Sequence, residues 1–500
     1  MNRNKISRKL AWGLIAALFM GLGYTARAAQ PDNSQRPNLL FVFPDQWRGQ
    51  ALGFLGEEPV QTPVLDRMSK EALVLTHAIS NAPQCVPYRA MLMSGMYPHS
   101  NGILCNCYGD KTPRHMKPSV VWWSDILAGQ GYELGYVGKW HLPPKRFEYQ
   151  GEPLEGIETH WVPPEARHSF KYWYHLTSNS HGNAPYWGPD NGPKDSRKTH
   201  QWTPIFEADR IIDFLRNEDG AVRDPAKPFA MVWSANPPHM PYHSAPEEYK
   251  KLYENVDVED LCRPFPNIPP KGEKWGDYYR KNIKGYYAQM TGVDAEFGRV
   301  LACLEEQGLA DNTIVVFTSD HGDCLGRHNY ISKNNHYQES IAVPCLIRWP
   351  GKIKPRRDNL LFNTPDFYPT MLSLLGLQQE IPDATEGVDY ARLFLEGEGK
   401  RPTSQLYTVQ GFNEAGKGPS MGERGIRTQT HTLMVRQMKP KDSLTVFLHD
   451  NIADPYQMKN LADEQPELVQ QLIKEELRPW LERTKDPWLT KAQPFPPAAL

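Results

Sequence analysis

The stretch "TIVVFTSDHGD", Thr313–Asp323, joins a run of apolar residues to a group of charged ones. A continuous apolar run without alternation is typical of a strand buried on both faces, as in a parallel sheet. Four further runs of this kind are Leu39–Phe43, Tyr132–Val137, Phe229–Ser234 and Val343–Arg348. Helix-period segments such as "TPVLDRMSKEALVL" and "YYAQMTGVDAEFGRVLACLEEQGL" lie between them. The pattern predicts an α/β fold with a large, mostly parallel central sheet flanked by helices.

Charged or imidazole side chains follow four of these runs. In chain order the polar residues at the run ends are Asp45, Gln46, Lys139, His141, His239, Asp320 and His321. Ligands of such sheets bind at the carboxyl ends of the strands. We therefore expect a functional site at this edge of the sheet.

A second, smaller unit is expected near the C-terminus. "SQLYTVQG", "RGIRTQTHTLMVRQ" and "LTVFLHDN" alternate as antiparallel strands do, and "DEQPELVQQLIKEELRPWLERT" is an amphipathic helix pattern. The Gly/Glu-rich link near Glu396–Lys400 is the expected boundary. The predicted division is a catalytic domain at 36–395 and a small α+β subdomain at 401–490.

The N-terminus is typical of a secretory signal peptide over residues 1–28. Four basic residues in Met1–Lys9 precede an apolar run to about Leu22, and Ala26-Arg27-Ala28 is a small-x-small cleavage pattern. A single membrane anchor is the alternative, but the run is short and rich in Gly and Ala. We expect a periplasmic or secreted protein that has no membrane association after signal removal.

Composition excludes some partners and raises a question about the cysteines. With 500 residues and a net charge of −2, nothing in the balance of charges indicates nucleic acid or an anionic membrane as partner. Seven cysteines leave at least one without a partner in the chain. We interpret Cys105 and Cys107 as structural or disulfide-forming.

Cys85 is the second residue of the stretch "QCVPYRAMLMSG", which has the pattern of a helix start. Pro87 suits a first helical turn, so Cys85 is expected at the N-terminus of a helix. That position favours an anion and lowers the pKa of a thiol. A buried structural cysteine is the alternative, and it would be the commoner one for an isolated pattern.

The chain resembles the sulfatase family, the formylglycine-dependent branch of the alkaline phosphatase-like superfamily, from Pro37 to about Leu472. The motifs that carry the resemblance occur in family order: "PDQ", "CVPYRAMLMSGMYPHSNG", "GKWHL", "NPPHMPY", "SDHGD", "SKNNHYQES" with "VPCLIRWPG", "DFYPTMLSLLGL" and "LHDNIADPYQMKNLA". The resemblance implies an alkaline phosphatase-like sandwich and a sulfuric ester hydrolase. It also implies that a maturation enzyme oxidises Cys85 to Cα-formylglycine, which explains an unpaired thiol.

The same resemblance implies a divalent metal site. Its ligands would be Asp45, Gln46, the residue made from Cys85, Asp320 and His321. Calcium is the family ion, and carboxylates suit it. Many sulfatases have a second Asp where this chain has Gln46, and imidazole is a poor calcium ligand, so Mn²⁺ and Mg²⁺ stay open.

The catalytic roles are likewise implied by resemblance. Arg89 would hold the formylglycine hydroxyl and a ligand carboxylate, Lys139 would bind the diol, and His141 would take the second hydroxyl proton. His239 and Lys333 would bind sulfate oxygens, and one of them would protonate the leaving oxygen. For each residue the alternative is an ordinary turn, cap or surface position. Tyr88 departs from the small residue usual in the cysteine motif.

Two other functions stay open, together with the substrate. One is a phosphodiester or phosphonate monoester hydrolase of the same superfamily, and the other is a non-catalytic glycan-binding relative with Cys85 unmodified. The aromatic-rich insertion His160–Trp202 suggests a sulfated saccharide as substrate, because aromatic faces stack on sugar rings. The alternative is that its aromatic residues pack on the core.

Overall fold

The computed structural model describes residues 36–106, 115–142, 148–154, 160–176, 179–409, 422–437 and 443–491. The signal peptide predicted at residues 1–28 and the side chain of Cys107 lie outside these ranges. The six described cysteines are free thiols, Cys105 among them.

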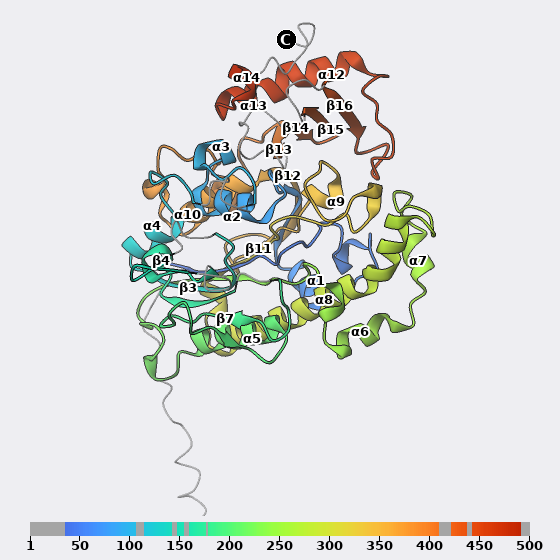
Figure 1. Cartoon of the computed structure of the whole chain (residues 1–500). Coiled ribbons are helices and arrows are strands. Elements are labelled where there is room, and N and C mark those ends of the chain that lie inside the picture. The colour runs from blue at the N-terminus through green and yellow to red at the C-terminus, as the bar shows by residue number, and fades with distance from the viewer. Residues whose placement is uncertain are drawn as a thin grey trace, which may run out of the picture.

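An eight-stranded sheet forms the centre of the larger part of the chain (Figure 1). Its strands are, from edge to edge, β12 (Arg356–Asn363), β2 (Leu73–Ile79), β11 (Leu346–Arg348), β10 (Thr313–Phe317), β1 (Asn38–Val42), β9 (Phe229–Ser234), β3 (Glu133–Lys139) and β6 (Tyr172–Leu176). Five neighbouring strands are parallel to one another, namely β10, β1, β9, β3 and β6. β11 is antiparallel to both of its neighbours, β10 and β2. The predicted α/β class is confirmed, and all five apolar runs contribute a strand.

The sequence pattern misplaced one helix boundary. "TPVLDRMSKEALVL" was expected to be helical throughout, but α1 covers only Pro63–Met68 and β2 begins at Leu73. β2 pairs with β11 and β12, and Leu73 and Leu75 belong to the buried core. Pairing with strands distant in sequence therefore outweighs the helical period of the sequence and makes the end of this segment a strand.

Helices cover both faces of the sheet, because successive residues of a buried strand face opposite sides. In β1, Leu39 and Phe41 belong to one core cluster and Leu40 and Val42 to the other. The first face carries α2 (Cys85–Ser94), α4 (Trp123–Gly129) and α10 (Phe367–Leu374), and the second carries α5 (Thr203–Arg216) and α8 (Lys274–Glu306). These two helical layers lie above and below the sheet in Figure 1.

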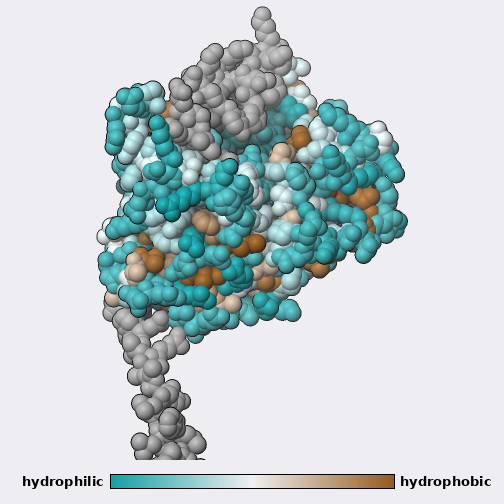
Figure 2. All heavy atoms as spheres, turned by 60° about the horizontal axis from the view of Figure 1, so that its bottom comes forward, coloured by the Kyte–Doolittle hydropathy of each residue, from teal (hydrophilic) through white to brown (hydrophobic). Residues whose placement is uncertain are grey.

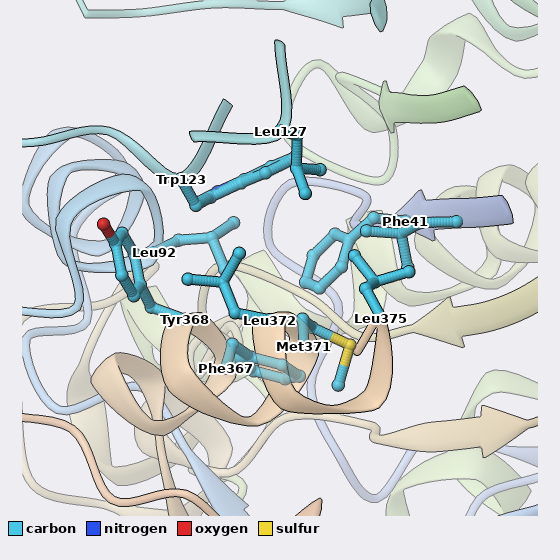
Figure 3. A pocket seen from close by; sticks show the side chains of 10 residues that line it. Phe41, Leu92, Trp123, Leu127, Phe367, Tyr368, Met371, Leu372 and Leu375 are labelled. Carbon is cyan, nitrogen blue, oxygen red and sulfur yellow. The ribbon is translucent and has the colours of Figure 1, made fainter. Parts of the chain in front are cut away.

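One small apolar cavity lies between the sheet and the first helical layer (Figure 3). Its volume is about 10 Å³, and Phe41, Leu127 and Leu372 are among the residues that line it. A space of this size holds at most about one water and is otherwise closely packed. It is a feature of the core and not a ligand site.

The C-terminal part contains a four-stranded antiparallel sheet and a helical layer. The strands are β13 (Ser404–Val409), β14 (Gly422–Thr428), β15 (His431–Gln437) and β16 (Thr445–Asp450). α12 (Pro466–Leu472) continues through a π-helical turn at Ile473–Leu477 into α13 (Arg478–Arg483). Met91 of α2 packs in the same core cluster as Leu433 and Leu477, so this subdomain rests on the helix that begins at Cys85.

The aromatic-rich insertion is largely part of the core. It supplies the edge strand β6, and Trp173 and Trp187 are fully buried. Trp161, Tyr186 and Trp202 are also buried. These side chains therefore pack on the protein, as the alternative interpretation had it.

The face in Figure 2 is mostly hydrophilic, with hydrophobic residues in small groups. Within the described ranges, none of the helices has the length and apolarity needed to cross a membrane.

Candidate active site

Neighbouring parallel strands bring the predicted site residues to one edge of the sheet. Asp45 follows β1, His239 follows β9, Lys139 ends β3, and Asp320 follows β10. These four strands are adjacent in the sheet. Their carboxyl ends therefore present the four side chains to the same place.

Cys85 lies at the first residue of α2 and is 1% exposed. Gln84 before it is extended, and Pro87 follows in the first turn, as the sequence predicted. The Cys85 sulfur lies 3.0 Å from Nζ of Lys333 and 3.4 Å from Nε2 of His321. The sulfur is therefore within reach of an amine and an imidazole.

Four buried side chains form a group that suits a divalent cation. Ligand atoms of Asp45, Cys85, Asp320 and His321 all lie within 4.8 Å of one another. Burial, with Asp45 beside it, raises the pKa of the Asp320 carboxyl to about 6. Two carboxylates this close and this buried repel each other, and a bound divalent ion would relieve that repulsion. The donor set therefore fits the implied metal.

Two cationic side chains hold the carboxylates. One guanidinium nitrogen of Arg89 donates to Oδ2 of Asp45 at 3.3 Å and to Oδ2 of Asp320 at 3.2 Å. The other donates to the backbone oxygen of Lys139 and to the Ser234 hydroxyl. Nζ of Lys139 lies 2.7 Å from Oδ2 of Asp45. Arg89 is 1% exposed, so it is no surface helix residue.

Charges in the site shift several pKa values. Burial would raise the pKa of the Asp45 carboxyl, but Lys139 and Lys333 hold it well below its ordinary value. Burial and Asp45 would raise the pKa of the Cys85 thiol, but the same two lysines and His321 lower it well below its ordinary value. The surroundings of residue 85 therefore favour a negative charge there.

The two remaining histidines also lie in this group. Burial lowers the pKa of the His141 imidazole, while a hydrogen bond with Cys85 acts the other way. Burial, followed by Lys139 and Lys333, lowers the pKa of His239 well below its ordinary value. Nδ1 of His239 lies 2.9 Å from the backbone oxygen of Met240, which can only accept, so Nδ1 carries the proton. Both rings are thus held as neutral imidazoles beside residue 85.

Gln46 is fully buried, with a positive φ of 73°. Its carbonyl oxygen accepts from the Ser332 hydroxyl and from Nζ of Lys333, both at 3.2 Å. Its backbone N–H donates to Asp320 at 3.0 Å. The side chain therefore joins the site, although its carbonyl faces a lysine in this structure.

The structure thus brings together all ten residues singled out in the sequence, while their individual roles stay predictions. Sequence reasoning missed several side chains that support them: Tyr136, Ser234, Tyr242, Asp323 and Ser332. Asp323 lies within the quoted "SDHGD", so its place two residues after His321 was an available signal. Tyr242 ends the quoted "NPPHMPY" and Ser332 begins "SKNNHYQES", so both lie in motifs singled out in the sequence, but only the fold shows that they contact Gln46.

Comparisons with known proteins agree along most of the chain. A sulfatase family model matches residues 37–377, and a model for the C-terminal region of N-sulphoglucosamine sulphohydrolase matches 326–484. An endo-4-O-sulfatase of Bacteroides thetaiotaomicron is 36% identical over 505 residues, covering 95% of this chain and 97% of that protein. An ulvan-active sulfatase of Formosa agariphila is 34% identical over 439 residues, with 86% and 78% covered.

A solved structure is similar as well. A Bacteroides thetaiotaomicron protein, described with the metabolism of multiple glycosaminoglycans, superposes with a TM-score of 0.83 at 35% identity. The match covers 91% of this chain and 98% of that one.

Proposed function

This chain belongs to the sulfatase family and is a sulfuric ester hydrolase, and we propose that it removes sulfate from a saccharide through a formylglycine made from Cys85. The observation that carries the proposal is the position of Cys85. It begins a helix, it is buried, and two carboxylates, a histidine and a lysine surround its sulfur. A merely structural cysteine has no need of such surroundings.

The modified residue and the metal would each supply one kind of chemistry. A hydrated aldehyde at position 85 offers one hydroxyl to attack sulfur and expel the alcohol, and a second whose deprotonation releases sulfate and restores the carbonyl. A cation held by Asp45, Asp320, His321 and residue 85, with the Gln46 carbonyl beside them, would lower the pKa of a ligated hydroxyl. We propose Ca²⁺, with Mn²⁺ or Mg²⁺ as alternatives.

The chain's own side chains bind the sulfate and move the protons. Lys139 would bind the diol at position 85, and Lys333 would bind sulfate oxygens and stabilise the negative charge that develops on them. Arg89 keeps the two carboxylates in place. His141 lies against residue 85, where a neutral imidazole can accept the hydroxyl proton.

His239 would serve the leaving group. Because its Nδ1 proton is engaged by a backbone oxygen, Nε2 is the atom left to face the substrate. The negative charge of a bound sulfate ester would favour protonation of Nε2, which would then bind a sulfate oxygen and deliver the proton to the departing alcohol oxygen. Lys333 is the alternative donor for that proton.

The substrate class follows from the relatives. The two curated relatives carry the names endo-4-O-sulfatase and ulvan-active sulfatase, and the solved structure is described with glycosaminoglycan metabolism. We therefore propose a sulfated saccharide. The aromatic insertion lends little support, because most of its rings are buried in the core.

Export and domain organisation complete the proposal. We propose that residues 1–28 direct the chain to the periplasm or the medium, and that a formylglycine-generating enzyme binds it transiently and modifies Cys85. The catalytic domain would span 36–395 and the C-terminal subdomain 401–490. The link at 396–400 between α11 (Ala391–Glu396) and β13 fits that boundary.

One experiment tests the function. The protein is co-produced with a maturation enzyme, and the mass of the peptide that contains Cys85 is measured. Sulfate release is then followed on an aryl sulfate and a panel of sulfated saccharides. We expect conversion of Cys85 and turnover that Cys85→Ala abolishes. A thiol that stays unmodified in an inactive protein would favour the non-catalytic glycan-binding relative.

A phosphodiester or phosphonate monoester hydrolase is the second candidate. Gln46 stands where many sulfatases have a second Asp, and His321 brings an imidazole to the cation site; both residues suit that branch as well. Rates on an aryl sulfate and an aryl phosphodiester separate the two. We expect the sulfate to react faster.

A further inference from the structure

The side-chain amide of Gln46 uses all of its hydrogen-bonding capacity within the protein. Its two N–H groups donate to Oδ2 of Asp323 at 2.7 Å and to the Tyr242 hydroxyl at 3.2 Å. Its carbonyl oxygen accepts from Ser332 and Lys333. An amide has two donors and two acceptor lone pairs, so none is left over.

The chemistry of the neighbours dictates which way this amide faces. An ionised carboxylate can only accept and an ammonium can only donate. The nitrogen must therefore face Asp323 and the oxygen must face Lys333. Tyr242 agrees, since its hydroxyl hydrogen goes to the same Oδ2 of Asp323 at 2.5 Å and leaves its oxygen free to accept from Gln46. The other carboxylate oxygen of Asp323, Oδ1, accepts a hydrogen bond from the backbone N–H of Leu325 at 2.8 Å.

The oriented carbonyl in turn holds the ammonium of Lys333. Nζ lies 3.2 Å from Oε1 of Gln46 and 3.0 Å from the Cys85 sulfur, with Oδ1 of Asp45 4.0 Å away. A lysine head on a four-carbon stem has little positional preference of its own. Its place at residue 85 depends on the groups that accept its hydrogen bonds.

We propose that Asp323 is a positioning residue that, through Tyr242 and the Gln46 amide, fixes the Lys333 ammonium against residue 85. These hydrogen bonds run from the Asp323 carboxylate to the Gln46 amide, from the amide to the Lys333 ammonium, and from the ammonium to residue 85. We call this chain of contacts the relay. Both lone pairs of the Gln46 carbonyl are engaged here, so a contact with the cation would require Ser332 or Lys333 to give up its hydrogen bond. The effect on catalysis rests on the proposed function, whereas the effect on the position of Lys333 does not.

A double-mutant cycle tests the relay. Asp323→Asn keeps the shape of the side chain but replaces one carboxylate oxygen with an NH2 group. That NH2 group would then face N–H or O–H groups that are donors themselves. We expect kcat/KM on an aryl sulfate to fall about tenfold in the otherwise wild-type enzyme, and by about twofold or less when Lys333→Ala is already present. Equal losses in both backgrounds would overturn the proposal, because Asp323 would then act independently of Lys333.

A rescue variant separates positioning from general stability. In Gln46→Glu a carboxylate oxygen replaces the N–H facing Asp323, so two like charges meet and activity should drop. Adding Asp323→Asn gives that oxygen a donor, and we expect the double variant to be more active than Gln46→Glu alone. A double variant as poor as the product of the two single effects argues against the relay.

Asp366→Asn is the matched control. Asp366 is a buried carboxylate that accepts backbone N–H groups of Asn363 and Val388, both at 2.8 Å. This variant should lower Tm and leave kcat/KM unchanged. If Asp323→Asn behaves in the same way, its role is structural only and the proposal fails.

A crystal structure of Asp323→Asn with Cys85 unconverted gives a readout that needs no activity. We expect the Gln46 amide to turn and Nζ of Lys333 to leave hydrogen-bonding distance of the sulfur. An ammonium that stays in place overturns the relay, even if the wild-type enzyme is an active sulfatase. Conversely, a displaced ammonium supports it even if no sulfate ester is hydrolysed.

Discussion

Arg89 binds Asp45 and Asp320 through a single guanidinium nitrogen, at 3.3 and 3.2 Å. The arginine comes from the second turn of α2, and the carboxylates follow β1 and β10, two parallel strands that are neighbours in the sheet. This contact ties the helix that presents Cys85 to the strand ends that present the cation ligands. The nucleophile position and the metal site are therefore built as one unit.

Removal of Lys333 tests the electrostatic part of the site. We expect Lys333→Ala to lower kcat/KM on an aryl sulfate by on the order of a hundredfold, because a preorganised cation beside the reacting group is lost. The measurement is steady-state kinetics on fully converted enzyme. Lys352→Ala, at an exposed lysine, is the control and should change nothing. A loss below about threefold would exclude a direct role for Lys333.

Chelation tests the cation site. Dialysis against EDTA should abolish sulfate release and lower Tm, because Asp45 and Asp320 are then left facing each other in a buried place. Adding back Ca²⁺, Mg²⁺ or Mn²⁺ singly, with metal analysis, should restore both quantities and rank the ions. Unchanged activity and Tm in demonstrably metal-free protein would contradict the metal site.

Glu207 gives a prediction for stability against pH. Burial raises the pKa of its carboxyl to about 8 in the folded protein, against about 4.3 in an unfolded chain. A raised pKa means that the unfolded state loses its proton first. The stability that this group contributes is complete below about pH 4 and falls as pH rises toward 8.

Glu207→Gln removes that dependence while keeping acceptors and donors for Tyr186 and Trp233. Scanning calorimetry at several pH values should show a Tm advantage of the variant that grows from pH 5 to pH 8. Glu396→Gln, at an exposed pair with Arg392, serves as the control. A difference that does not change with pH would mean that Glu207 is ionised in the folded state.

The core cavity of Figure 3 predicts a cost for enlarging it. Leu372 is 1% exposed, and shortening it to Ala should reduce the free energy of unfolding by about 2–5 kcal/mol. Denaturant titration measures this, and KM should stay as it was because α10 contributes none of the ten site residues. Leu252→Ala, at a leucine 45% exposed, should cost far less.

Much of the fold was predictable because strands buried on both faces of a sheet have a pattern of their own. Each of the five apolar runs became a strand, including β11, which is antiparallel to both of its neighbours. β2, β6 and β12 were missed. β2 continues a helix-period segment, β6 lies in the aromatic-rich insertion, and β12, "RRDNLLFN", begins with exposed and half-buried polar residues at the sheet edge. For these three, strand partners distant in sequence decide the structure.

Apolar runs and the polar residues that end them are local features, so the amino-acid order alone is enough to say which chemical groups are present and where they follow a strand. How those groups contact one another depends on the folded arrangement. Gln46 and Asp323 lie 277 positions apart, yet their hydrogen bond dictates which way the amide faces. Tyr242 and Ser332 complete that geometry from two further segments. Such contacts depend on the order of the strands in the sheet, which no local sequence pattern indicates.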